Sequence, residues 1–346
     1  MTLTLQNPLD MHLHLREGAM LDSVLPFTAQ AFSAALVMPN LKTPITTTDL
    51  ALAYKKQILE SATKSGYTDF MPFMSIFLTP SLDKNELQKA KLNGIRILKL
   101  YPKGATTGSE NGVGEILDDK TLEVFALAQE LGFILSIHGE SNGFCMDREF
   151  EFLRVFKHIA TNFPKLRIII EHMSDRRSLE AIESYENLYA TLTLHHISMN
   201  LDDVCGGMLN PHHFCKPMLK TKKDQQALLQ AALNAHPKVS FGSDSAPHLE
   251  SAKLSAKGAA GIFSAPVLLP ALAQLFEEHN KLENLQAFVS DRAFGIYGLD
   301  SANIPQKSVR LVREPSIVPS KISTSFGDMS GVVPLFADKI LQWRLG

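Results

Sequence analysis

Cysteine is scarce in this chain, and the cysteines present do not form a framework. Cys145, Cys205 and Cys215 are an odd set with no Cys-x-x-Cys spacing. This pattern excludes a disulfide-stapled fold and a zinc site built from thiolates. The first ten residues, MTLTLQNPLD, also lack the basic start and the apolar run of a signal peptide. We therefore expect a protein of the reducing cytoplasm.

An excess of charge of either sign is also absent. The chain holds 34 Lys and Arg against 36 Asp and Glu, so the formal net charge is −2. Binding to nucleic acid or to an anionic membrane needs clustered basic residues, so neither partner is expected. The uncharged stretch Gly258–Phe276 contains Pro266 and Pro270, which predicts a buried helix begun by a proline rather than a membrane span. A small-molecule partner is the expectation that remains.

The chain has 346 residues, of which 45% are hydrophobic, so it could hold two average domains or one large barrel. Short apolar runs rich in β-branched and aromatic residues alternate with helical patterns. The predicted strands are Leu9–Leu15, Ala35–Asn40, Phe70–Leu78, Ile95–Tyr101, Phe133–Gly139, Leu166–His172, Tyr189–His195 and Val239–Asp244. Eight such units predict the α/β class and a closed (β/α)8 TIM barrel. An open doubly wound sheet is the alternative, but Arg16-Glu17-Gly18 stands where its glycine-rich turn would be.

Several local signals mark where the helices begin and end. Asp83 and Glu86 have the spacing of a capping box, and Gly94 and Gly132 stand where helices should stop. Two more helices are expected at 265–278 and 285–294. The last stretch, 308–346, contains the short extended pieces VRLV and ILQW, which predict a small β appendage packed on the barrel. We therefore expect residues 1–346 to form a single domain.

Polar side chains gather where the predicted strands end, which in a barrel is the face that carries the active site. Residues 12, 14 and 16 point to the same side of the first strand because side chains alternate along a strand. The candidates at the strand ends are His12, His14, Arg16, Asn40, Lys99, His138, His172, His195, His196 and Asp244. Imidazole and carboxylate groups are ligands that zinc accepts. Four of these histidines, His12, His14, His138 and His172, together with Asp244 are too many for one catalytic zinc, so two metal ions are indicated.

Lys99 is the unexpected member of this set, because an ammonium group would be repelled by two cations. Burial lowers the pKa of a lysine, and the neutral amine can then add carbon dioxide to form a carbamate. The carbamate is anionic and has two oxygens that can span two metal ions. We therefore hypothesise that Lys99 is carboxylated.

Other residues keep alternative interpretations. A single histidine is more often a surface or satisfied core residue, which is how we interpret His158, His213, His236 and His279. For His195 and His196, a role in supporting the metal ligands stays open. The loop at 103–112, KGATTGSENG, has the composition of a mobile flap, although an exposed loop without a role is the alternative.

These residues lie in segments that resemble the amidohydrolase superfamily, and within it the shorter bacterial type of dihydroorotase. The segments are DMHLHLREG at 10–18, VMPN at 37–40, KLYPKGATTGSENGV at 99–113, IHGE at 137–140, EHMS at 171–174, NPHHFCKPMLK at 210–220 and GSDSAPH at 242–248. A His-x-His pair alone is a weak signal. The pairing of HLHLR with GSDSAPH at this separation is specific, and the similarity spans most of the chain.

The resemblance implies a role for each matching position. One zinc ion would be held by His12, His14 and Asp244, the second by His138 and His172, with carboxylated Lys99 and a hydroxide bridging the two. Asp244 would act as the catalytic acid and base. The carboxylate of the substrate would be held by Arg16, Asn40 and His248, with main-chain contacts from Lys216 and Ala260, under a lid at Thr106 and Thr107.

The implied activity is the reversible hydrolysis of (S)-dihydroorotate to N-carbamoyl-L-aspartate, a step of de novo pyrimidine (UMP) biosynthesis, by a cytoplasmic homodimer. A cyclic amide hydrolase of the hydantoinase or allantoinase type is a near alternative with the same metals. A catalytically dead barrel is a third, but all six ligand positions are filled. The sequence departs from the family at Lys216, where an apolar residue is expected, so a main-chain contact is the tolerable role there.

Overall fold

The computed structural model describes residues 1–324 and 331–346, and at its centre lies a ring of parallel strands. The strands are β2 (Leu9–Leu13), β3 (Ala34–Val37), β4 (Met71–Phe77), β5 (Ile97–Leu100), β6 (Ile134–Ile137), β7 (Arg167–Ile170), β8 (Leu188–Leu192) and β9 (Val239–Phe241). Each strand pairs in parallel with the next one along the chain. This order confirms the predicted (β/α)8 barrel, and the doubly wound alternative is wrong because its strand order would reverse at a switch point.

The ring closes where the first strand meets the segment after the last one. Leu13 forms a parallel bridge with Ser245. The amide of His14 donates to the carbonyl of Ser245 at 3.1 Å, and the amide of Asp244 donates to the carbonyl of His12 at 2.8 Å. The closure therefore places two predicted ligand segments side by side.

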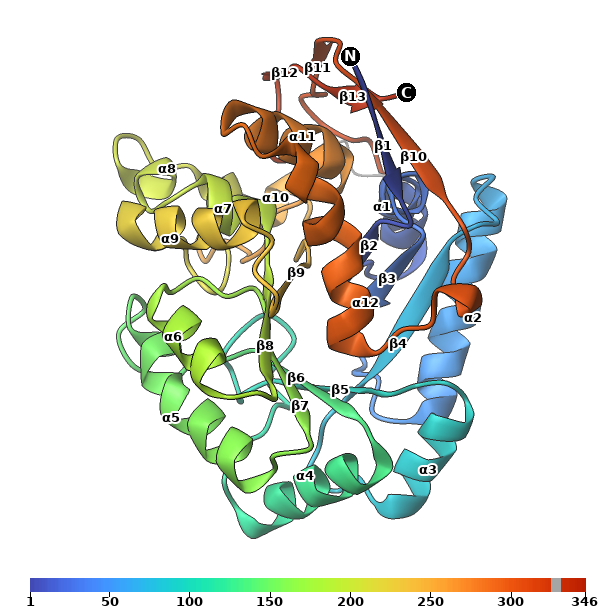
Figure 1. Ribbon diagram of the computed structural model, residues 1–346, viewed down its shortest axis with the longest axis vertical. Helices are drawn as coiled ribbons and strands as arrows, with labels where there is room; N and C mark the ends of the chain where they lie inside the picture. The colour runs from blue at the N-terminus through green and yellow to red at the C-terminus, as the bar shows by residue number, and fades with distance from the viewer. Residues whose placement is uncertain (325–330) are drawn as a thin grey trace.

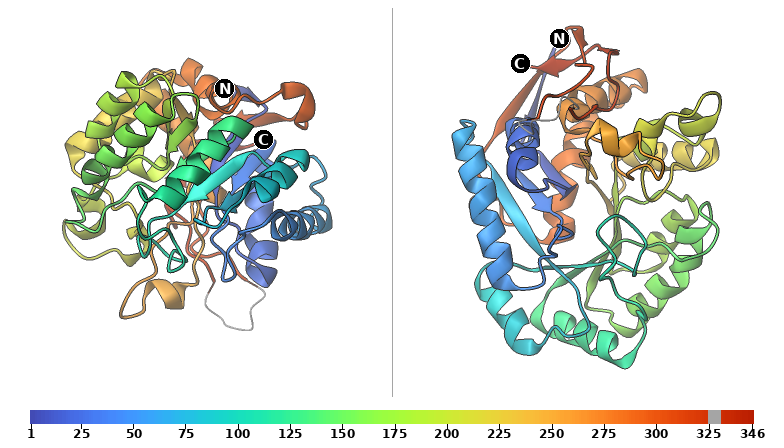
Figure 2. Two further views of the ribbon diagram at one scale, coloured as in Figure 1. Left: turned by 90° about the horizontal axis from the view of Figure 1, so that it is seen from below. Right: turned by 180° about the vertical axis from the view of Figure 1, so that it is seen from behind.

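Helices surround the strands, as Figure 1 and the two views of Figure 2 show. The longer ones are α1 (Gly18–Ala31), α2 (Thr48–Lys64), α3 (Lys84–Leu92), α4 (Asp119–Leu131), α5 (Arg148–Asn162), α6 (Arg177–Ser184), α9 (Lys222–Leu233), α11 (Leu268–Glu278) and α12 (Arg292–Tyr297). Short helices occupy the segments after β8 and β9: α7 (Leu194–Ser198), α8 (Asp202–Cys205) and α10 (Glu250–Lys253). Single turns of other helix types lie at Pro211–His213, Ala265–Val267, Leu282–Asn284, Ala287–Asp291 and Ser301–Asn303.

The predicted helix signals are confirmed in part. Asp83 accepts a hydrogen bond from the amide of Glu86 at 2.8 Å, so it caps α3. The carboxylate of Glu86 instead accepts from the amide and hydroxyl of Thr48, which ties the start of α3 to that of α2. Gly94 and Gly132 both have positive φ angles just beyond their helices, as expected.

The uncharged stretch 258–276 ends in a buried helix, as predicted. Pro266 lies in the turn Ala265–Val267, and α11 follows directly with most of its residues buried. Among residues 1–324 and 331–346, no helix combines the length and the apolar character needed to cross a bilayer.

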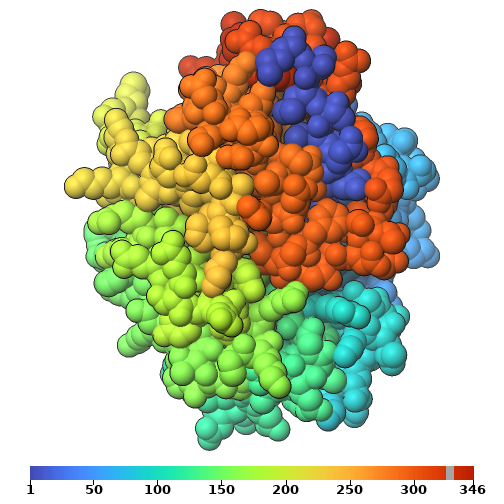
Figure 3. All heavy atoms as spheres, viewed as in Figure 1, coloured from blue at the N-terminus to red at the C-terminus, as the bar shows by residue number. Residues whose placement is uncertain are grey.

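The predicted β appendage is present, and it also takes up the first residues of the chain. β10 (Ser308–Val312) pairs with β1 (Thr2–Gln6), a strand that the sequence patterns did not indicate. The remaining strands are β11 (Ser316–Ile317), β12 (Ile340–Leu341) and β13 (Arg344–Leu345). Figure 3 shows the N-terminal segment lying directly against the C-terminal part of the chain. The predicted range 308–346 includes 325–330, which lie outside the described residues.

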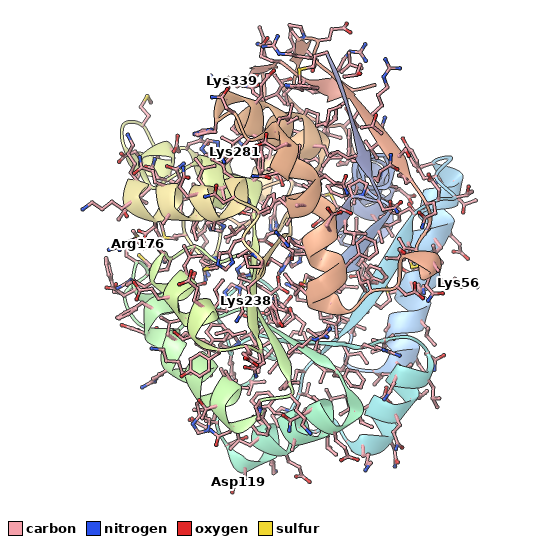
Figure 4. The ribbon with its side chains drawn as sticks, in the orientation of Figure 1. Lys56, Asp119, Arg176, Lys238, Lys281 and Lys339 are labelled. Atoms are coloured by element: carbon pink, nitrogen blue, oxygen red, sulfur yellow. The ribbon has the colours of Figure 1, made fainter. Side chains whose placement is uncertain are left out.

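Charged side chains project from the outer helices. Figure 4 shows Lys56, Asp119 and Arg176 at the periphery of the molecule, and all three are exposed.

The two ends of the barrel interior are filled by different kinds of side chain. At the amino end of the strands the interior is filled by buried apolar residues such as Leu9, Ile97 and Ile134, so the carboxyl end is left to hold the polar groups.

The predicted strand bounds need correction at the carboxyl end. Predicted strands 133–139, 166–172 and 239–244 stop earlier in the structure, so His138, His172 and Asp244 lie just beyond β6, β7 and β9. The predicted strand Tyr189–His195 ends at Leu192. His195 lies in α7 instead, because the hydroxyl of Thr193 accepts from the amide of His196 and starts a helix there.

Candidate active site

Three of the predicted metal ligands lie together at the closure of the barrel. The Nε2 atoms of His12 and His14 are 3.3 Å apart. Oδ1 of Asp244 lies 3.1 Å from Nε2 of His14 and 3.5 Å from Nε2 of His12. All three side chains are buried, and burial is the largest cause of the lowered pKa of His12, to about 4. Two neutral imidazoles and a carboxylate directed at one point are a donor set that fits a zinc ion.

His138 and His172 form a second pair just beyond the neighbouring strands β6 and β7. Nδ1 of His138 lies 3.0 Å from Nε2 of His172. Nε2 of His138 contacts the carboxylate of Glu140 at 2.8 Å, so it carries the proton and Nδ1 presents a lone pair. Nδ1 of His172 is buried and has no hydrogen-bond partner in the part of the chain that the structure describes. The two facing nitrogens fit a cation between them.

Lys99 is fully buried near both groups of ligands. Its Nζ atom has no hydrogen-bond partner among the described residues and lies 5.1 Å from the centre of the Tyr101 ring. The charge of Lys99 contributes to the lowered pKa of His12 and of His172, one from each group, after the larger effect of burial. Burial also lowers the pKa of Lys99 itself to about 8. An unpaired buried amine is costly, and a carbamate bridging two cations would remove that cost.

Two carboxylates that the sequence interpretation left without a role support the imidazoles. Glu171 accepts from Nδ1 of His12 at 2.7 Å, and the hydroxyls of Ser136 and Thr191 also donate to it. Burial alone would raise the pKa of Glu171, but the charge of His12, the charge of Lys99 and these bonds together lower it to about 2. Glu140 supports His138 in the same way. The only sequence signal is position: Glu171 directly precedes His172, and Glu140 follows His138 by two residues.

The backbone is strained at three of the predicted site residues. Arg16, His172 and Asp244 have φ angles of 60°, 40° and 45°, a region that residues other than glycine seldom adopt. Asp10 helps to hold one of these turns, because its carboxylate accepts from the amide and hydroxyl of Ser243 at 2.7 and 2.6 Å. Strain held by surrounding bonds is typical of functional sites.

The predicted substrate-binding residues other than His248 line a small cavity next to the first ligand group. Its lining is His14, Arg16, Asn40, Thr106, Thr107, Lys216, Asp244, Ala246, Ala260 and Gly261. The amide group of Asn40 donates to the carbonyl of Thr107 at 3.0 Å, so the loop at 103–112 lies over the cavity. A Cβ atom on Gly108 would come within 3.1 Å of the Asn40 carbonyl, and its φ is +73°. This placement favours the flap interpretation over that of an exposed loop without a role.

One ring nitrogen of His248 cannot satisfy both of its neighbours. Nε2 of His248 lies 3.0 Å from Nη2 of Arg16 and 2.9 Å from the carbonyl oxygen of Ala260. If Nε2 carries a proton it can donate to the carbonyl but cannot accept from Arg16. If it carries none, the carbonyl loses its donor. An anion that accepts from Arg16 would resolve this conflict.

His195, His196 and Cys215 form another buried group outside this site. Nε2 of His196 and the thiol of Cys215 both contact the carbonyl of Pro217, at 3.1 and 3.2 Å. His196 therefore helps to hold the segment that carries Lys216, and the role in supporting the metal ligands that the sequence left open for it stays a hypothesis. His195 has no partner for either ring nitrogen among the described residues.

The other histidines lie away from the predicted ligands. His158 and His279 are exposed, and His213 and His236 are partly buried. This agrees with their interpretation as surface or satisfied residues: His213 contacts the carbonyl of Asp203, and His236 lies 3.5 Å from Glu183.

Comparisons with known proteins agree on one family. Residues 9–300 match the model of the Amidohydrolase family. A dihydroorotase of Helicobacter hepaticus is 70% identical over 344 residues, which cover 99% of this chain and 98% of that protein. The crystal structure of dihydroorotase from Campylobacter jejuni has a TM-score of 0.92 and 41% identity, covering 99% of this chain and 97% of the other. The structure of dihydroorotase from Saccharomyces cerevisiae in complex with 5-fluoroorotic acid also has a TM-score of 0.92, with 34% identity and coverage of 100% and 98%.

Proposed function

The chain belongs to the amidohydrolase family and, within it, to the dihydroorotases, and from this membership we propose that it hydrolyses (S)-dihydroorotate reversibly to N-carbamoyl-L-aspartate with a pair of zinc ions. This reaction is a step of de novo pyrimidine biosynthesis. The observation that carries the two-zinc proposal is the placement of Lys99. Its buried amine, which has no hydrogen-bond partner in the described part of the chain, lies near two separate sets of ligand nitrogens.

Each zinc ion would have its own ligands from this chain. His12, His14 and Asp244 would hold one ion, and His138 and His172 the other, with the carboxylated Lys99 shared between them. When bound, the zinc pair lowers the pKa of a water molecule and polarises the ring carbonyl of the substrate. The protein fixes the ligands beforehand, because Glu171 orients the ring of His12.

Asp244 is the proposed catalytic acid and base. Its Oδ1 faces the two imidazoles, which leaves Oδ2 to take a proton from the attacking water and return it to the departing amide nitrogen. Burial is the largest influence on its pKa, which is raised above the ordinary value, and a raised pKa makes a carboxylate a better base. The strained turn at Asp244 holds the carboxylate in this place.

The carboxylate of the substrate would bind at the part of the cavity that Arg16 lines. The guanidinium of Arg16 can donate two parallel hydrogen bonds to it, with Asn40, His248 and the main chain of Lys216 and Ala260 completing the site. This side of the cavity favours a ring that bears an acid group over the neutral rings of a hydantoinase. Thr106 and Thr107 would close over the bound ring as a lid.

The direct test is an assay of zinc-loaded protein with dihydroorotate and, in parallel, with dihydrouracil and hydantoin. We expect turnover of dihydroorotate alone, and loss of that turnover after complete chelation. Faster hydrolysis of hydantoin or dihydrouracil would assign the chain to the alternative reaction. Full activity after chelation would contradict the metal mechanism.

We also propose a compartment and an oligomeric state for the enzyme, namely a homodimer in the cytoplasm. All three cysteines are free, which suits a reducing cytoplasm. A homodimer is expected from the general tendency of soluble enzymes to form symmetric assemblies. Light scattering on the purified protein would give a mass of about twice 38.2 kDa if this is correct, and the mass of one chain if it is not.

A further inference from the structure

A buried lysine behind the cavity binds three carbonyl groups at once. Lys253 is the last residue of α10, and only 5% of its surface is exposed. Its Nζ atom donates to the carbonyls of Phe214 at 2.8 Å, Ala259 at 2.9 Å and Gly261 at 2.7 Å. Three acceptors require three hydrogens, so the group is a charged ammonium and every hydrogen is used.

These carbonyls belong to the two main-chain segments that border the cavity. Phe214 lies two residues before Lys216, and Ala259 and Gly261 flank Ala260. The segments also bond directly, because the amide of Gly261 donates to the carbonyl of Phe214 at 2.9 Å. Lys253 therefore joins the two stretches of backbone that are expected to contact the substrate.

The hydrogen bond from Lys253 to the carbonyl of Ala259 also sets the direction of the Ala260 amide. The carbonyl of Ala259 and the N–H of Ala260 belong to one trans peptide unit, in which they point in opposite directions. Since the carbonyl points at Lys253, the N–H points away from it. Ala260 lines the cavity, so this orientation suits an amide that donates to a ligand there.

The ammonium adds a positive charge on the same side of the cavity as Arg16. After burial and the charge of Arg16, the charge of Lys253 is the next cause of the lowered pKa of His248, to about 3. Two cations therefore act on the place where a carboxylate would bind, one by direct contact and one from behind the backbone.

We propose that Lys253 is a positioning residue that fixes the main-chain side of the carboxylate site and supplies it with a buried positive charge. This inference rests on the proposed function, because that function identifies the cavity as the place of the substrate carboxylate. Lys253 does not touch the substrate. Its effect is therefore expected in binding rather than in the chemical step.

The test compares Lys253→Met with a matched variant, Lys307→Met. Lys307 is also buried and also donates to two carbonyls, those of Ala29 and Phe32, away from the cavity. For Lys253→Met we expect the Kd of 5-fluoroorotate and the KM of dihydroorotate to rise about tenfold, with kcat changing less than about threefold. Lys307→Met is expected to lower the Tm and to leave Kd and KM unchanged.

A third variant and a local measurement separate positioning from a general loss of stability. Lys253→Arg keeps the charge, so its Kd is expected to lie between those of the wild type and Lys253→Met. Amide hydrogen exchange in Lys253→Met is expected to rise at 214–220 and 258–263, which can be observed even if the wild type fails to hydrolyse dihydroorotate. Unchanged Kd and unchanged exchange, or equal changes in both methionine variants, would overturn the proposal.

Discussion

The two ends of the barrel interior differ in what the same strands bury. On β5, Ile97 lies at the apolar end and Lys99, two residues on, at the polar end. A similar pair is Ile169 on β7 and Glu171, which lies directly after that strand. The isoleucines belong to an apolar cluster, whereas the residues two positions further along are surrounded by histidines and carboxylates. Residues two apart share a face of a strand, so one interior surface changes its chemistry within a single repeat.

This difference separates stability from chemistry. Burial of the isoleucines is favourable without any partner. Burial of Lys99 is unfavourable, since its Nζ atom is unpartnered among the described residues. In the metal-free protein, the favourable burial at the apolar end therefore offsets the unfavourable burial at the polar end. Substitutions at the two ends should have opposite effects on activity and on the stability of the metal-free protein.

The largest effect is expected at the polar end, from Lys99→Met. Methionine is similar in length but cannot form a carbamate, so we expect kcat to fall by about a thousandfold or more. The free energy of unfolding of the metal-free protein should stay equal or rise by about 1–2 kcal/mol, because an apolar chain replaces a buried amine that has no partner within residues 1–324 and 331–346. Steady-state assays and denaturant titration measure both. Retention of most of the activity would contradict the role of Lys99.

The reverse pattern is expected from Ile169→Ala at the apolar end. Removing a fully buried side chain should lower the free energy of unfolding by about 2–4 kcal/mol. The kcat of the folded fraction should remain within about twofold of the wild type, since Ile169 belongs to the apolar cluster and is not a proposed ligand. Denaturant titration together with an active-site count gives the two values. A large fall in kcat with little loss of stability would show that the two ends are not separate.

An intermediate effect is expected from Glu171→Gln, which weakens the support of His12 without removing a ligand. The affinity for zinc should fall by about 10- to 100-fold, as is typical when a carboxylate partner of a metal-bound histidine is lost. Glu149→Gln is the matched control, because Glu149 is equally buried and is bonded to Ser174 and Ser178 rather than to a proposed ligand. Competition with a chelator measures zinc affinity, and equal losses in the two variants would count against the assigned role.

The smallest effect is expected at the lid. Replacing Thr106 and Thr107 together by Ala should lower kcat/KM by about three- to tenfold through lost hydrogen bonds to the bound ring. Thr63→Ala, on the exposed side of α2, serves as the control and should have no effect. Unchanged kinetics in the double variant would return the loop to the interpretation of an exposed segment without a role.

The barrel could be predicted because its repeat is local: each apolar run and the helix after it can be recognised within a few tens of residues. β1 was missed because its partner, β10, lies about 300 residues away, so no nearby pattern indicates the pairing. The end of β8 was placed too late because the cap at Thr193 competes with strand formation.

The candidate ligands could be predicted from residue type and from their positions at strand ends. Their carboxylate partners could not, because the bond from His12 to Glu171 joins residues 159 apart. Lys253 was missed for the same reason: its acceptors are backbone carbonyls, which no residue pattern identifies. Sequence therefore indicates which side chains bind, and three-dimensional contacts are needed to show what orients them.

The most direct measurement is anomalous X-ray scattering at the zinc edge on crystals of the zinc-loaded enzyme. We expect two peaks per chain, one among His12, His14 and Asp244 and one between His138 and His172, with electron density for a carboxyl group on Lys99 between them. A single peak, or an unmodified Lys99 beside two peaks, would contradict this expectation.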